Sequence, residues 1–175
     1  MNRADDGSRL RGAVARIACG DLDALEDVWK MLSRPLHNYA YALTGSQEEA
    51  DDVLGDVMVR LAGQGKRLLA VREPKAYLYA SVRNAALSWR RRLRWRGGAE
   101  AEAATGDGVE AAAAAVAIRH AVMALPVAQR EVVVLHVWGG LTFADAGRVA
   151  GVSANTAASR YRYALEKLRE ALGDE

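Results

Sequence analysis

The sequence lacks most of the features on which enzymes, secreted proteins and membrane proteins depend. A single cysteine, Cys19, excludes a disulfide within the chain, which fits a reducing compartment. Three histidines, at positions 37, 120 and 136, have no metal-ligand spacing to that cysteine or to each other. No apolar run approaches the ~20 residues that span a bilayer, and no cleavable leader is recognisable. We therefore expect a cytoplasmic protein without membrane insertion, metal or cofactor, and not an enzyme, because no catalytic residue can be nominated.

The charge is nearly balanced overall but unevenly distributed. The net charge is +2, yet residues 1–98 carry 17 basic and 12 acidic residues, whereas residues 99–175 carry 7 and 10. Between positions 83 and 96 there are six arginines and no acid, and acidic groups precede them at 21–27 and 48–56. Separate patches of opposite sign predict two kinds of partner surface on one small domain.

Apolar residues recur at helical spacing, and no alternating run predicts a strand. The sequence predicts helices over about 9–19, 21–32, 35–43, 47–62 and 74–95, and then 111–125, 126–138, 142–150 and 153–172. The boundary at 32–35 rests on Pro35, which suits the first turn of a new helix. Residues 97–117 are mostly Ala, Gly, Glu, Asp and Thr, a composition typical of a flexible linker, although the alanines at 111–115 favour the next helix.

The predicted fold is therefore all-α, with two small helical domains over residues 1–96 and 118–175, joined by the linker 97–117. The second domain contains the strongest motif, a short helix, a turn at Gly151 and a longer helix capped by Ser153, which together define a helix-turn-helix. Exposed polar and basic side chains after the turn would reach the major groove of DNA. These candidates are Ser153, Asn155, Thr156, Ser159, Arg160 and Arg162. The plainer interpretation is a helical hairpin with a solvated face.

Several short motifs in the second domain occur in a familiar order. They are Leu125-Pro126, Gln129-Arg130-Glu131, Gly140-Leu141-Thr142-Phe143, Ala150-Gly151-Val152-Ser153 and Ser159-Arg160. This order resembles region four of bacterial sigma factors, which binds the upstream promoter element at minus thirty-five. One departure is Asp145-Ala146-Gly147, where the family usually has Glu-Ile-Ala.

The first domain resembles sigma region two. The motifs are Gly20-Asp21, Leu43-Thr44-Gly45, Glu49-Ala50-Asp51-Asp52-Val53, Pro74-Lys75-Ala76-Tyr77-Leu78-Tyr79 and Val82-Arg83-Asn84-Ala85. Together the two matches resemble the minimal, extracytoplasmic-function type of sigma factor, which keeps only regions two and four. The resemblance implies promoter DNA and core RNA polymerase as partners, the latter through its beta-prime clamp helices and beta flap. It also implies control by an anti-sigma factor.

The resemblance assigns two groups of residues in the first domain. The acidic helix would dock on the clamp helices through Asp51, Asp52, Val53, Leu54 and Asp56, with the apolar pair as anchors and the acids for steering. The loop at 63–73 and the helix after Pro74 would open the minus-ten element through Lys66, Arg67, Arg72, Lys75, Arg83, Asn84, Arg90 and Arg91. Tyr77 and Tyr79 can stack on bases or pack the core, and helical spacing favours the core for one of them.

Two other functions compete with a sigma factor. A stand-alone helix-turn-helix transcription regulator would bind duplex DNA, usually as a dimer. It predicts a dimerisation helix or a ligand domain in the first half, whereas this half offers acidic and basic helices. The other is an interaction protein whose helix-turn-helix is vestigial. For a sigma factor we expect the two domains of the free chain to be mobile or collapsed onto each other until polymerase spreads them.

Overall fold

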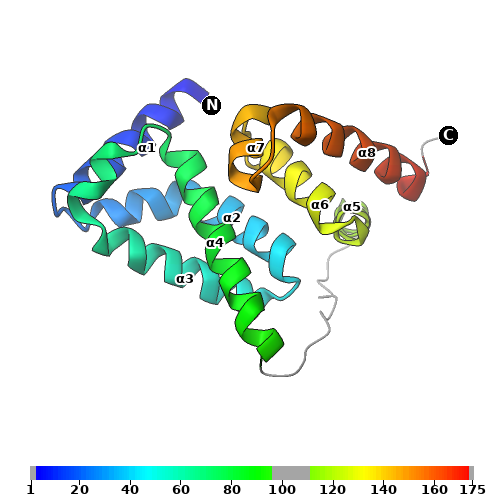
Figure 1. Ribbon diagram of the computed structural model, residues 1–175, viewed down its shortest axis with the longest axis horizontal. Coiled ribbons are helices and arrows are strands. Elements are labelled where there is room, and N and C mark those ends of the chain that lie inside the picture. The colour runs from blue at the N-terminus through cyan, green and yellow to red at the C-terminus, as the bar shows by residue number, and fades with distance from the viewer. Residues whose placement is uncertain (1–2, 96–110, 174–175) are drawn as a thin grey trace.

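The computed structural model describes residues 3–95 and 111–173, and all regular secondary structure in these ranges is helical. The first half contains α1 (Arg3–Ala18), α2 (Ala24–Thr44), α3 (Gln47–Gly63), the 3₁₀ helix η1 (Gly65–Ala70) and α4 (Pro74–Trp95). The second half contains α5 (Ala111–Ala124), α6 (Val127–Val133), the π-helical η2 (Val134–Trp138), α7 (Phe143–Ala150) and α8 (Ala154–Leu172). Figure 1 shows the two helical groups side by side, with α4 facing α7. The all-α prediction is confirmed.

Local start and stop signals set most helix ends where the sequence predicts them. Gly45, with φ 82°, ends α2 in the left-handed conformation that glycine adopts without steric cost. The Ser46 side chain then caps α3 by accepting a hydrogen bond from the Glu49 backbone N–H. Thr142 and Ser153 cap α7 and α8 in the same way.

The predicted break at Pro35 is wrong, because α2 runs through it without interruption. Proline lacks the N–H that would complete a helical hydrogen bond, so a continuous helix needs compensation from packing. Leu32 and Leu36, on either side of the proline, supply it, since they are 7% and 0% exposed. The predicted loop at 63–73 contains the helix η1, and the end of the predicted linker, from Ala111, begins α5. The rest of the linker, residues 97–110, lies outside the described residues.

The two halves share one hydrophobic core. Helices α2 and α4 of the first half pack against α6, η2 and α7 of the second. Leu36 and Tyr79 belong to the same buried cluster as Leu135 and Ala146, which come from η2 and α7. In this structure the halves are therefore packed together, the collapsed form of the arrangement expected above.

Candidate DNA-binding and polymerase-binding surfaces

The helix-turn-helix of α7 and α8 is closed by an unusually tight turn. Gly151 adopts φ 71° at the end of α7, and the Val152 N–H donates to the Gly147 carbonyl oxygen over 2.8 Å. A Cβ at position 147 would lie 2.8 Å from the Val152 carbonyl oxygen and 3.1 Å from that of Ser153. Glycine at 147 thus lets the turn fold directly onto α7, while the fully buried Ala157 lies on the inner side of α8.

The predicted recognition residues lie along the start of α8. Ser153, Asn155, Thr156 and Arg162 are exposed, whereas Ser159 and Arg160 are half-buried. The Ser153 hydroxyl accepts from the Thr156 N–H at 3.1 Å, which caps the helix and leaves its positive dipole end facing outward. Arg162 donates weakly to the Ser159 hydroxyl at 3.4 Å. The structure therefore places all six on one helical segment, with four of them directly open to a ligand.

An aromatic cluster that the sequence analysis missed holds this motif together. The ring of His136 stacks on Phe143 at a centroid distance of 4.2 Å, and Tyr161 meets His136 edge-on at 5.0 Å. The His136 Nδ1 lies 2.8 Å from the Leu141 carbonyl oxygen. The residues come from η2, α7 and α8, so their proximity carries no signal in the sequence.

The acids of α3 form an exposed surface, but the two apolar residues assigned with them do not belong to it. Asp51 pairs with His37 of α2 at 3.2 Å, and both Asp52 and Asp56 are exposed. Val53 and Leu54 lie in the core at 1% and 3% exposure, so they hold α3 in place and offer no anchor to a partner.

Another apolar residue on α3 is available instead. Val59 is 74% exposed, and it follows Asp52 and Asp56 at i+7 and i+3 along one face of the helix. A valine in an amphipathic helix is normally assigned to the core, so the exposure of Val59 has no signal in the sequence. On η1, Leu69 is also exposed, at 59%.

A small cavity lies between α3 and α4, and Asn84 is the one residue predicted for the minus-ten element that lines it. The cavity has a volume of about 130 Å³, and Gln64, Tyr77, Ser81 and Asn84 are among its lining residues. The Gln64 side-chain amide donates to the Tyr77 hydroxyl, which is therefore held at the rim. Tyr79 lies fully in the core, as the spacing predicted for one of the two tyrosines, and burial raises the pKa of its hydroxyl.

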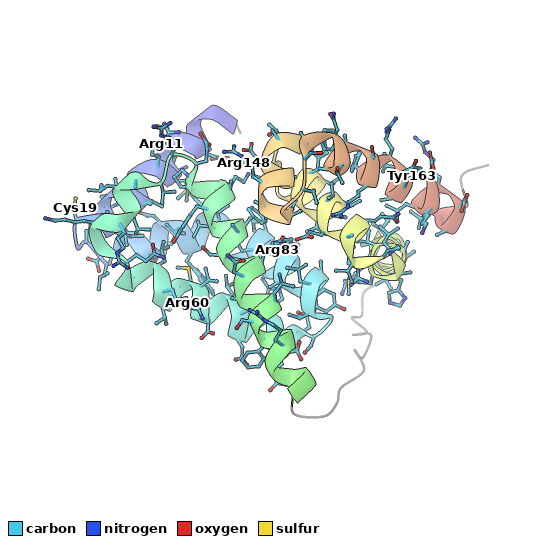
Figure 2. The ribbon with its side chains drawn as sticks, viewed as in Figure 1. Arg11, Cys19, Arg60, Arg83, Arg148 and Tyr163 are labelled. Carbon is cyan, nitrogen blue, oxygen red and sulfur yellow. The ribbon has the colours of Figure 1, made fainter. Side chains whose placement is uncertain are left out.

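The basic residues of this group are divided by the fold. Lys66, Arg67, Arg72 and Arg91 are exposed, whereas Lys75 and Arg83 are half-buried. The Arg90 side chain lies outside the described residues. Figure 2 shows Arg83 on α4, beside the C-terminal half. Its guanidinium pairs with a residue of the second half, so in this structure it is not free to contact the minus-ten element as the resemblance implies.

The partner of Arg83 is a buried carboxylate from α6. Glu131 is 4% exposed, and its Oε1 accepts from the Arg83 Nε at 2.6 Å and from the Tyr39 hydroxyl at 2.8 Å. Burial, and then the charge of Glu131, raise the pKa of Tyr39 well above its ordinary value, so the phenol stays a donor. The preceding residue, Arg130, donates to the Ala42 carbonyl oxygen of α2 at 2.9 Å. The burial and pairing of Glu131 cannot be predicted from the sequence, because its neighbours along the chain show only a helix with apolar residues.

A groove also crosses between the halves. It has a volume of about 370 Å³ and is lined by residues of α2, α5 and η2, with apolar groups such as Tyr41 and Val122 and basic ones such as Arg34 and Arg119. Ile118 and Trp138, which also line it, are 43% and 44% exposed. Among residues 3–95 and 111–173, no group of three or more His, Cys, Asp or Glu side chains is placed to hold a metal ion. In the same part of the chain, no helix has the length and apolar character needed to cross a membrane.

Both halves match models of one protein class. Residues 28–96 match sigma-70 region 2, and residues 115–168 match sigma-70 region 4. The chain is 33% identical over 165 residues to the ECF RNA polymerase sigma factor SigM of Mycobacterium tuberculosis, which covers 91% of this chain and 83% of the relative. It is also 30% identical over 143 residues to SigL of the same organism, which covers 77% of this chain and 80% of the relative. The chain belongs to the ECF family of RNA polymerase sigma factors.

Solved structures share the fold over most of its length. The sigma factor RpoE of Bartonella quintana, in complex with the anti-sigma factor NepR, matches with a TM-score of 0.75, 22% identity, and coverage of 86% of this chain and 98% of that one. CnrH, in complex with the cytosolic domain of CnrY, matches with a TM-score of 0.67, 22% identity, and coverage of 94% and 97%. The likeness covers both halves in each case.

Proposed function

We propose that this chain binds core RNA polymerase and directs it to promoters, where it reads two DNA elements and helps to open the duplex. The observation that carries the proposal is the pairing of a region 2 match with a region 4 match in one chain that aligns with ECF sigma factors over 91% of its length. In this proposal, residues 1–96 are the core-binding and minus-ten domain, 97–117 the linker and 118–175 the minus-thirty-five domain. We expect the protein to act in the cytoplasm and to have no catalytic activity of its own.

The exposed face of α3 is the proposed polymerase surface. Asp52 and Asp56 supply negative charge for the clamp helices of the beta-prime subunit, while Asp51 is held at the edge of the face by His37. Charges of this kind raise the association rate and fix register, whereas affinity comes mainly from desolvated apolar contacts. The apolar contact we assign here is Val59, in place of the buried Val53 and Leu54.

The cavity between α3 and α4 is the proposed site for a base drawn out of the minus-ten duplex. Extruding a base costs a few kcal/mol, and a pocket with polar groups and a stacking surface offsets that cost. Gln64, Tyr77 and Asn84 provide these groups at the cavity. Lys66, Arg67 and Arg72, exposed on η1 and the following loop, would contact the phosphates of the separated strand.

The first turns of α8 are the proposed reader of the minus-thirty-five element. Free N–H groups and a positive dipole at the capped end suit a phosphate contact, and Arg160 and Arg162 add cations one to two turns later. Asn155 and Thr156 are the exposed uncharged donors nearest the tip of the helix. In this position such side chains hydrogen-bond to base edges in the major groove.

An anti-sigma factor is a further proposed partner. Both solved structures described above are complexes with a second protein, and for RpoE that protein is the anti-sigma factor NepR. The groove across α2, α5 and η2 supports the proposal in this chain, since it joins exposed apolar residues to a basic rim. An amphipathic segment with acidic residues along its edges would suit it.

Copurification with core RNA polymerase separates a sigma factor from the stand-alone regulator. Tagged chain and core enzyme would be mixed and resolved by size exclusion, and the expected result is co-elution that survives nuclease treatment. The matched pair of variants is Val59→Asp, which should reduce co-elution, and Val137→Asp, which should not; Val137 is another exposed valine, at 49%, in the second half. Binding of promoter DNA without any association with core enzyme would favour the stand-alone regulator.

A further inference from the structure

The most heavily buried charge in the described residues joins the two halves of the molecule. One oxygen of Glu131 accepts two hydrogen bonds, from Tyr39 of α2 and from Arg83 of α4. Both donors belong to the first half, and the acceptor to the second. While the halves are packed, the buried carboxylate needs these donors, because removing one partner of a buried charge pair leaves a charge uncompensated and destabilises the closed form.

The surrounding seam is packed closely enough to act with this contact. A Cβ at Gly139, which follows η2 directly, would lie 3.1 Å from the Tyr79 ring, so the end of η2 packs closely against α4. The Tyr79 and Tyr39 rings meet edge-on at 5.3 Å beneath it. Glu131 itself is only 4% exposed when the halves are together, so its carboxylate is largely shielded from water.

Closure covers part of the face that the proposed function assigns to the minus-ten element. Arg83 is engaged by Glu131, and the Lys75 ammonium lies 3.5 Å from the position of a Cβ on Gly140. By contrast, Lys66, Arg67 and Asn84 stay exposed. DNA cannot reach all of these groups at once while α7 is packed on α4.

We propose that Glu131 is a latch that keeps the free chain closed and withholds Arg83 from DNA until the two halves separate. This inference rests on the proposed function for the identity of the masked surface, but the closure itself is a property of the chain alone. On opening, Arg83 exchanges the carboxylate of Glu131 for a backbone phosphate. The chain thus binds promoter strands weakly until a larger partner holds its halves apart.

The test compares the free, full-length chain with Glu131→Gln, which keeps the shape of the side chain and removes its charge. Small-angle scattering should give a radius of gyration near 16 Å for the parent, as expected of a compact chain of 175 residues, and a larger value for the variant. The affinity for a fluorescent pool of random 12-nucleotide single strands should rise on the order of tenfold, because apparent affinity scales with the open fraction. Glu170→Gln, the same change at an exposed residue of α8, should alter neither quantity.

A second variant protects the test against misfolding of the first. Tyr39→Phe removes one hydroxyl and keeps the buried ring, so it should expand the chain and raise DNA affinity in the same direction by a smaller factor, with unchanged helical circular dichroism. The proposal is overturned if both variants stay as compact as the parent, if the parent is already expanded, or if expansion leaves DNA affinity unchanged. Failure of the proposed function would appear separately, as a chain that closes and opens in this way but does not co-elute with core polymerase.

Discussion

Replacing Gly147 with valine should disrupt the helix-turn-helix more than its position in a short helix suggests. In an exposed helix this change is mildly favourable, because valine has a helix propensity about 0.3–0.5 kcal/mol better than glycine. At position 147 the Cβ of the valine would lie 2.8 Å from the Val152 carbonyl oxygen. Its two methyl groups would add further bulk against the same turn. The obstacle is backbone, which cannot rotate away as a side chain would, so the turn at Gly151 must move.

Overpacking of this kind typically costs about 1–3 kcal/mol, and the small gain in propensity leaves a net loss of about 2 kcal/mol. Because the halves share one core, the chain of 175 residues should melt as one unit, and that loss lowers its melting temperature by roughly 4–8 °C. Thermal unfolding followed by circular dichroism, together with binding to a minus-thirty-five duplex, measures both consequences. Gly12→Val is the matched control, since nothing lies within 4 Å of a Cβ at that exposed position of α1. A Gly147→Val protein that melts and binds DNA like the parent would refute the argument from close approach.

Three further changes test the proposed surfaces. Arg160→Ala should weaken binding to the minus-thirty-five duplex by about 1–3 kcal/mol if it contacts a base, or equally for all sequences and with a shallower salt slope if it contacts phosphate; equal binding of mutant and parent at several salt concentrations would contradict this. Asp51→Lys combined with Asp52→Lys should reduce co-elution with core polymerase at unchanged helicity, and unaltered co-elution would remove α3 from the interface. The pKa of Asp145 is lowered, first by the hydrogen bond from the Thr142 hydroxyl and then by the Arg148 guanidinium. Its contribution to stability is thus present above pH ~4 and lost as the pH falls through the folded-state pKa. Asp145→Asn should lower stability at pH 7 and flatten its dependence between pH 2 and 4, so a variant with the parent's acid profile would exclude this role.

The candidate sites differ in how far the sequence predicts their geometry. The sequence predicted the turn and the start of α8, because a cap at Ser153 and a glycine turn are local signals, whereas the DNA contacts assigned to α8 stay a prediction. The assignment of Val53 and Leu54 as partner contacts was wrong. Which side of a helix faces the core and which faces a partner is settled only when the neighbouring helices are placed. Val59 became visible only when the packing of α3 against α2 and α4 was known.

Sequence alone determined the class of fold, most helix ends and the presence of a helix-turn-helix, since these depend on residues within one or two turns of each other. Gly45, Ser46 and Thr142 each act on their own segment, and their effect does not change with the tertiary structure. The continuity of α2 through Pro35 is the exception among helix ends, because burial on both sides outweighed the missing hydrogen bond.

Tertiary structure alone decided how the two halves meet and which charges are available to a partner. Tyr39 and Glu131 are 92 positions apart in the chain, and no local pattern links them. A carboxylate in an otherwise apolar stretch is stable only where donors from other helices reach it, because the cost of burying its charge must be met by hydrogen bonds and an opposite charge. Arg83 meets that requirement by pairing with Glu131. The stability of the contact therefore depends on long-range packing and not on the neighbours of either residue in the sequence.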